Sequence, residues 1–179
     1  MKTETLMWLL VCVFMFHDFE EIVMMIPWAR KNERWTRANA PAWLSQRVLG
    51  HFSRLSTSSF TLAVAEEFVV LSTLTFLAVE WNWYSFWAGL TLVFAVHLGV
   101  HFVQFVAFRR YVPVILTVIP AGLYCAYALW WMNDRHLIAW DQVGMWTVVL
   151  AIGLGANLML ALALGKRFET WLRRYLAGN

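Results

Sequence analysis

The sequence predicts an all-α protein, a polytopic transmembrane bundle of five helices that forms a single domain over residues 1–179. Of the 179 residues, 61% are hydrophobic and only 14% are charged, whereas a soluble domain carries about 25% charged residues. The chain also contains five apolar runs of about 20 residues, the length of helix that crosses the roughly 30 Å hydrocarbon core of a bilayer. These runs take up most of the chain and leave no room for a soluble domain.

The predicted spans are residues 6–26, 60–79, 83–107, 112–132 and 143–164. The first run begins at Leu6 and continues through the polar letters HDFEE to Ile26. Tryptophans gather near the ends of the spans, as Trp81, Trp83 and Trp130 show. Such positions are typical of an aromatic belt at the headgroups. Small residues at a four-residue spacing predict close helix contacts: Ala151 with Gly155 and Ala161 with Gly165 in the fifth span, and Ala95 with Gly99 in the third.

The connection between the first two spans is the longest, and its apolar residues recur at helical spacing. We expect an amphipathic helix that begins at Asn39 or Ala40, carries Pro41 in its first turn and lies on the cytoplasmic surface. Its apolar side comprises Trp43, Leu44, Val48, Phe52 and Leu55, and its more polar side holds Arg47 and Arg54. We interpret this segment as an interfacial anchor, with a lid over the bundle as the alternative.

Lysine and arginine are distributed very unevenly between the two ends of the predicted bundle. One end holds Arg30, Lys31, Arg34, Arg37, Arg47, Arg54, Arg109, Arg110, Lys166, Arg167, Arg173 and Arg174, and the other holds Lys2 and Arg135. The positive-inside rule therefore predicts a multi-pass protein of the inner (plasma) membrane with its N-terminus outside and its C-terminus in the cytoplasm. Because the basic residues flank the spans, the net charge of +3 points to membrane lipids as partners and not to nucleic acid.

Ionisable side chains inside the predicted spans are the main functional signal, because each one costs roughly 2.5–3.5 kcal/mol at the centre of a membrane helix. On an α-helix they all reach a single layer, about 8–15 Å below the cytoplasmic face. His17 shares a helix face with Glu20 and Glu21, and His97 shares one with His101. The set comprises His17, Glu20, Glu21, Glu66, Glu67, His97 and His101.

This combination of residues predicts a metal site. Four ionised glutamates in hydrocarbon would carry an unfavourable charge that two divalent cations would cancel, and imidazole and carboxylate groups bind iron, manganese and zinc. We therefore expect two ions, with iron favoured over zinc or manganese, and a mononuclear site as the alternative. Adjacent glutamates point about 100° apart, so Glu21 and Glu67 are candidates for proton transfer as well as ligands. The roles of Asp18 and Asn157 stay open.

The letters HDFEE at 17–21, EE at 66–67 and HLGVH at 97–101 resemble the HXXEE family of bacterial integral membrane proteins, which is named after its motif. The resemblance covers about the first 110 residues and implies that the same seven histidines and glutamates form the site. It implies a polytopic membrane protein and supplies no reaction. The histidine precedes the glutamates here, which departs from the Glu-x-x-His order of di-iron bundles.

Three functions fit these residues. The leading hypothesis is a di-iron-like oxidoreductase that acts on a lipid or other small apolar substrate from the cytoplasmic leaflet, with His17, Glu20, Glu66, His97 and His101 as ligands. The second is a zinc-dependent intramembrane hydrolase with Glu21 or Glu67 as the general base. The third is a transporter of protons or metal ions, since intramembrane Glu and His also mark ion pathways. The sequence leaves the oligomeric state open.

Overall fold

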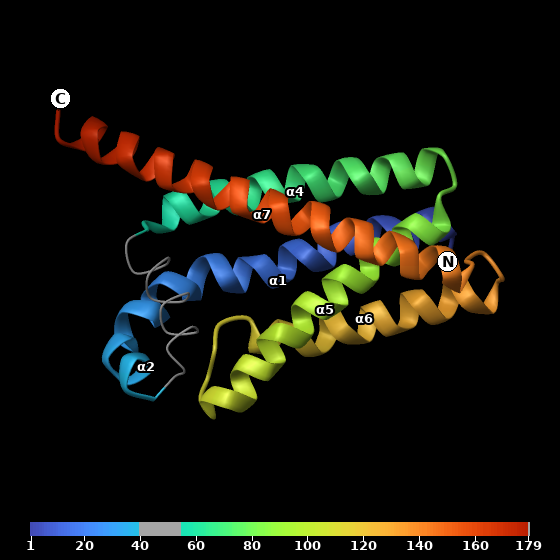
Figure 1. The fold of residues 1–179 in the computed structure, drawn as a ribbon, viewed down its shortest axis with the longest axis horizontal. Helices are drawn as coiled ribbons and strands as arrows, with labels where there is room; N and C mark the ends of the chain where they lie inside the picture. The colour runs from blue at the N-terminus through green and yellow to red at the C-terminus, as the bar shows by residue number, and fades with distance from the viewer. Residues whose placement is uncertain (40–54, 179) are drawn as a thin grey trace.

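A computed structural model describes residues 1–39 and 55–178, which fold into six helices (Figure 1). In chain order these are α1 (Thr3–Lys31), α2 (Glu33–Asn39), α4 (Thr57–Glu80), α5 (Tyr84–Phe108), α6 (Ile115–Asp134) and α7 (Trp140–Leu176). The described residues contain no strand. The all-α prediction is confirmed, and each of the five predicted spans lies within or nearly within one long helix.

Four helices, α4, α5, α6 and α7, are long and apolar enough to cross a membrane. The protein is therefore a multi-pass membrane protein by the length and composition of its helices. The predicted first span is also a continuous helix, α1, 29 residues long. It does not belong to the group of four, because Asp18, Glu20 and Glu21 interrupt its apolar run. Its crossing of the membrane stays a prediction.

The residues predicted to form the amphipathic interfacial helix lie almost entirely outside the described part of the chain. The structure describes only Asn39 and Leu55 at its two ends. It adds the short helix α2, which was not predicted. This helix has no apolar stripe that sequence periodicity could reveal, and an ion pair between Arg37 and Glu33, one turn apart with 2.9 Å between Nη2 and Oε1, spans it.

The five long helices alternate in direction along the bundle (Figure 1). Because of this alternation, the basic segments of the chain gather at one end. The start of α1, the turn from α4 to α5 and the connection from α6 to α7 lie at one end. The end of α1, the connection from α5 to α6 and the end of α7 lie at the other end, together with the described members of the large basic group. The predicted orientation, with the basic end in the cytoplasm, depends on this alternation of helix directions.

Helix α7 holds the bundle together by packing against both α4 and α5. At the contact with α5, a Cβ on Gly89 would lie 2.9 Å from Cβ of Trp146. At the contact with α4, a Cβ on Gly165 of α7 would lie 2.8 Å from the carbonyl oxygen of Ser59. The predicted contact at Gly165 is therefore present, and the contact at Gly89 is an addition to it. The contacts predicted at Gly99 and Gly155 are not found, because a Cβ at either position would meet no neighbouring helix within 4 Å among the described residues. Glycine allows two helix backbones to approach this closely.

Apolar clusters lie on both sides of the layer where the polar residues were predicted. The larger cluster joins α1, α4, α5, α6 and α7 through residues such as Leu10, Leu71 and Leu98. Two smaller clusters lie nearer the basic end, one around Met25 and Val64 and the other around Trp28 and Phe108. On α1 and α4 the polar residues fall between these clusters in the sequence. On α5 His101 does so as well, whereas His97 comes one turn earlier, between Phe94 and Leu98 of the larger cluster. The packing therefore isolates a polar layer inside the bundle.

Candidate metal centre

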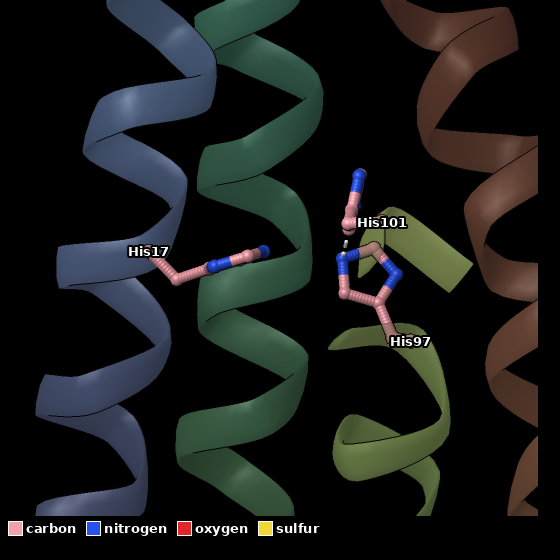
Figure 2. Close-up of side chains that lie close together, drawn as sticks. All are labelled: His17, His97 and His101. Carbon is pink, nitrogen blue, oxygen red and sulfur yellow. Dashed lines mark hydrogen bonds between the residues drawn. The ribbon is translucent and has the colours of Figure 1, made fainter. Parts of the chain in front are cut away.

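Three histidines from two helices converge in this layer (Figure 2). His17 comes from α1, and His97 and His101 lie one turn apart on α5, so both reach the same side of that helix. Each histidine offers one ring nitrogen, and these three nitrogens lie within 4.8 Å of one another. Figure 2 shows the ring of His17 directed across α4 toward the other two. The structure thus brings together all three predicted histidines.

The spacing of these rings is close to what a single metal ion requires. Nε2 of His97 and Nε2 of His101 lie 3.1 Å apart. Two imidazole nitrogens bound to one tetrahedral zinc ion, each at about 2.0–2.1 Å, are separated by roughly 3.3 Å. The ring of His17 lies 5.5 Å from that of His97 and 5.4 Å from that of His101, measured between centroids. A small movement of His17 would complete a three-nitrogen site.

Burial also favours a ligand at this position. His17 has no exposed surface and His101 is 6% exposed, while His97 is less buried. Within the described part of the chain, Nε2 of His17 is buried and has no hydrogen-bond partner. Leaving such an atom unpaired costs about 1–3 kcal/mol, so it is one of the few polar atoms here that needs a partner. A metal ion would accept the lone pair of this nitrogen, and the residues therefore fit a metal.

Phe94 forms the apolar wall of the histidine cluster. Its ring meets that of His17 edge-on at 5.8 Å between centroids and stacks with that of His97 at 6.3 Å. The imidazoles therefore have a hydrophobic neighbour on the side of the larger apolar cluster. Such a wall limits the access of water and holds the rings in place.

Glu20 does not join the histidine cluster directly. Its Oε1 accepts a hydrogen bond from the Tyr111 hydroxyl at 2.9 Å. Its Oε2 accepts two more from Thr117, at 3.1 Å from the backbone nitrogen and 2.9 Å from Oγ1. Thr117 lies in the first turn of α6, and its backbone nitrogen also donates to the carbonyl oxygen of Val114 at 3.1 Å. The carboxylate of Glu20 thus binds the start of α6.

Tyr111, in the connection between α5 and α6, remains a hydrogen-bond donor to Glu20 at any physiological pH. Burial, together with the hydrogen bond to Glu20 and its charge, raises the pKa of Tyr111 to about 12. Its carbonyl oxygen in turn accepts a hydrogen bond of 2.7 Å from the indole of Trp28 near the end of α1. This connection is therefore fastened to α1 at two points.

Of the remaining predicted glutamates, Glu66 and Glu67 lie on α4 and Glu21 lies on α1. Glu66 accepts a hydrogen bond of 3.0 Å from Asn157 of α7. Glu67 of α4 lies close enough to Glu21 and Asp18 of α1 for their charges to interact. Asp18 is only 3% exposed. The structure thus separates the seven predicted residues into the histidine cluster, Glu20 at the start of α6, Glu66 in contact with Asn157 of α7, and Glu21 with Glu67 between α1 and α4. Whether the glutamates also bind a metal stays a prediction.

Two residues that matter for this site were not singled out in the sequence. Thr117 contacts both His17 and Glu20, with 3.1 Å between its Oγ1 and Nδ1 of His17. Tyr111 contacts Glu20 from outside the helices. In the sequence, the signal for a site is an ionisable group within an apolar span, and a neutral hydroxyl near a helix start carries no such signal. Helix α6 therefore contributes to the site through Thr117.

Comparison with known families gives one match, to a model described as a protein of unknown function with HXXEE motif, over residues 8–131. The match includes every histidine and glutamate discussed above, and it also reaches Tyr111 and Thr117. No curated protein and no solved structure matches the chain. The matched region covers more than half of the sequence, and the resemblance seen in the three motifs is thereby confirmed. The chain belongs to the HXXEE family of proteins.

Proposed function

We propose that His17, His97 and His101 bind one divalent metal ion and that the protein is a membrane-embedded, zinc-dependent hydrolase acting on a small apolar substrate. The observation that carries this proposal is the convergence of three imidazole nitrogens within 4.8 Å of one another. Three protein ligands with a fourth position left for water or substrate are typical of catalytic zinc sites. A bound zinc ion would supply Lewis acidity and activate water for hydrolysis.

The composition of the cluster favours one ion over two. Dinuclear carboxylate sites draw glutamates from facing helices into the same group as the histidines. Here Glu20 and Glu66 are engaged by Thr117 and Asn157, on helices other than those that carry the histidines. Three histidines also differ from the two-histidine, one-carboxylate set typical of mononuclear iron oxygenases. The di-iron oxidoreductase therefore becomes the second candidate, and two iron ions per chain would restore it.

Glu21 and Glu67 are the residues we assign to proton transfer. Glu21 follows His17 by one helical turn, and Glu67 faces it from α4 closely enough for their charges to interact. Within the described residues neither carboxylate is held by a hydrogen bond, in contrast to Glu20 and Glu66. A carboxylate left free in a polar layer can accept a proton from a water molecule.

We further propose that α1 crosses the membrane with the other four long helices and that the basic end faces the cytoplasm. Helix α1 packs between α4 and α6, both of which are candidate spans. The layer lies nearer the basic end, so an apolar substrate would enter from the inner leaflet of the plasma membrane. The large apolar cluster beyond it supports an enzyme over a transporter, because its members, among them Leu6, Leu10, Trp87 and Leu90, include no carboxylate or imidazole group.

Cobalt substitution tests for an ion with an open position. The purified full chain in detergent is loaded with Co²⁺ and its visible spectrum is recorded during a titration with azide. We expect ligand-field bands that shift as azide binds, and no such bands in His101→Ala. His136→Asn serves as the control, because His136 lies in the connection between α6 and α7, at the end of the bundle opposite the basic end. This variant is expected to keep both the ligand-field bands and their shift with azide. A cobalt spectrum that azide leaves unchanged would indicate a closed, structural site and contradict the hydrolase.

The role of Glu21 is tested by hydrolysis of p-nitrophenyl laurate, an ester with an apolar chain, in mixed micelles. The zinc-loaded protein is expected to release p-nitrophenol, and Glu21→Gln is expected to lose roughly 10²–10⁴-fold in rate while it keeps its zinc. Equal rates in Glu21→Gln and in the unaltered protein would remove Glu21 from the mechanism.

A further inference from the structure

The hydroxyl of Thr117 lies between a histidine of the metal centre and a carboxylate. Its Oγ1 lies 3.1 Å from Nδ1 of His17 and 2.9 Å from Oε2 of Glu20. His17 and Glu20 are three residues apart on α1 and so share a helix face, which allows one side chain of α6 to contact both. The three residues form a continuous hydrogen-bonded chain across the contact between α1 and α6.

The direction of each hydrogen bond in this chain follows from the number of hydrogens available. A threonine hydroxyl has one hydrogen to donate and can accept through its lone pairs. Besides Glu20, the carbonyl oxygen of Val114 lies within 3.0 Å of Oγ1 as an acceptor. The hydroxyl hydrogen of Thr117 points either to Glu20 or to Val114, and in both cases it points away from His17. Oγ1 can then only accept from Nδ1 of His17, which must carry the hydrogen.

The arrangement around Glu20 supports this direction. Its carboxylate accepts from the Tyr111 hydroxyl on one oxygen and from the Thr117 backbone nitrogen and hydroxyl on the other. If the hydroxyl hydrogen pointed to His17 instead, two oxygen atoms 2.9 Å apart would face each other with no hydrogen between them. A carboxylate is also a stronger acceptor than a neutral imidazole nitrogen, because charge strengthens the bond.

We propose that Thr117 and Glu20 are positioning residues that hold His17 in the tautomer with hydrogen on Nδ1 and a free lone pair on Nε2. This inference rests on the proposed metal site and assigns to Glu20 a role other than ligand. The atom left free is Nε2, one of several buried nitrogens that have no hydrogen-bond partner among the described residues. It is the outer nitrogen of a ring directed toward His97 and His101 (Figure 2). A carboxylate acting on a metal-binding histidine in this way fixes its orientation and strengthens it as a ligand.

The same contact links the metal site to the position of α6. The backbone nitrogen of Thr117 belongs to the first turn of α6 and donates to Glu20. This turn follows Val114, a fully buried residue with a left-handed backbone at φ 73°, which is unusual for a β-branched residue. The orientation of His17 therefore depends on where α6 begins and not on α1 alone.

The experiment compares Thr117→Val with Thr117→Ser in the full chain in detergent micelles, first without metal. Valine keeps the size of threonine and the backbone contact with Glu20 but removes Oγ1, whereas serine keeps it. Histidine labelled with ¹⁵N reports the tautomer of His17, assigned by the signal that disappears in His17→Gln. We expect hydrogen on Nδ1 in the unaltered protein and in Thr117→Ser, and a shift toward hydrogen on Nε2 in Thr117→Val.

Zinc affinity gives the second readout. Loss of a group that orients a metal-binding histidine lowers affinity by roughly 10–100-fold, so we expect this loss in Thr117→Val and its recovery in Thr117→Ser. Thr75→Val changes a fully buried threonine in α4, away from His17, and should leave both the tautomer and the affinity unchanged. Circular dichroism of each variant confirms that the helices are intact.

The outcomes separate this inference from the proposed metal site. Hydrogen on Nε2 of His17 in the unaltered protein, or a Thr117→Val variant with unchanged tautomer, would overturn the positioning role. An unchanged zinc affinity in Thr117→Val would overturn it as well. If the tautomer behaves as expected but the unaltered protein binds no zinc, the positioning of His17 stands and the proposed function fails.

Discussion

Asn157 of α7 donates a hydrogen bond to Oε2 of Glu66 on α4 across a distance of 3.0 Å. This is a polar contact between two candidate membrane spans in the layer where the histidines lie. Hydrogen bonds of this kind between membrane helices contribute about 0.6 kcal/mol on average and up to roughly 2 kcal/mol. The contact engages a glutamate that the sequence analysis placed among the metal ligands.

Asn157→Leu is therefore expected to destabilise the protein by about 0.5–2 kcal/mol, measured by unfolding in mixed detergent micelles. A double-mutant cycle with Glu66→Ala serves as the control, because the two changes should not add if the residues interact. Fully additive effects would show that the contact contributes nothing.

Glu66→Gln separates the two accounts of the metal site. The amide keeps an oxygen that can accept from Asn157, so stability should change little. If only histidines bind the ion, zinc affinity should also stay within about threefold of that of the unaltered protein, as measured by competition with a chelator. A loss of metal would place Glu66 among the ligands, as the dinuclear hypothesis predicts.

The contact of α5 with α7 predicts a contrast between two glycines. A Cβ on Gly89 would lie 2.9 Å from Cβ of Trp146 and 3.0 Å from the backbone nitrogen of Thr147. Gly89→Ala must separate the helices and is expected to cost about 1–3 kcal/mol of unfolding free energy. Gly99→Ala is the matched control on the same helix, since a Cβ at that position would meet no described atom of a neighbouring helix within 4 Å. Equal melting temperatures for the two variants would contradict the close contact.

At the basic end, Glu169 of α7 binds the start of α4. Its Oε2 accepts from the backbone nitrogen of Ser56 at 2.8 Å and from Oγ of Ser59 at 2.6 Å, and its Oε1 accepts from Arg173. Glu169→Gln is expected to cost about 1–2 kcal/mol, because hydrogen bonds to a charged group are stronger than neutral ones. Glu33→Gln removes a more exposed ion pair, with Glu33 at 42% side-chain exposure, and should cost about 0.5 kcal/mol or less.

The contribution of Glu169 should depend on pH in a defined direction. Burial opposes its ionisation, but the hydrogen bonds from Ser56, Ser59 and Arg173 outweigh burial and lower the pKa of Glu169 from 4.5 to about 2. A group with a lowered folded-state pKa stabilises the fold above its unfolded value and loses this effect as the pH falls toward the folded value. The stability difference between the unaltered protein and Glu169→Gln should therefore be full above pH 4.5 and shrink toward pH 2. A constant difference over this range would contradict the assignment.

Much of the helix pattern follows from the sequence, because lipid imposes long apolar runs. The predicted fourth span, 112–132, corresponds to α6 at Ile115–Asp134, and the others agree to a similar degree. The largest difference is at the end of α7, which continues to Leu176, well past the predicted end of the fifth span. Its last turns carry Lys and Arg, which hydropathy excludes from a span but which are good helix formers.

The site could be predicted only in part. Helical spacing places His97 and His101 on one face, and the depth of His17 brings it level with them, so the histidine cluster could be anticipated. The partners of the glutamates could not be, since spacing within one helix says nothing about which neighbour each face meets. Glu20 meets α6 and Glu66 meets α7 because of the way the helices pack. The depth of each residue in the membrane, counted along its own helix, falls in the same layer for all of these side chains. Depth alone therefore cannot distinguish the separate contacts.

Metal content tests the central claim most directly. The full chain, purified in mild detergent and supplied with zinc, is analysed by inductively coupled plasma mass spectrometry beside His97→Ala, His101→Ala and His136→Asn. We predict about one zinc ion per chain in the unaltered protein and in His136→Asn, and loss of that ion in the other two variants. The same zinc content in all four proteins, or none in any of them, would contradict a metal site built from His17, His97 and His101.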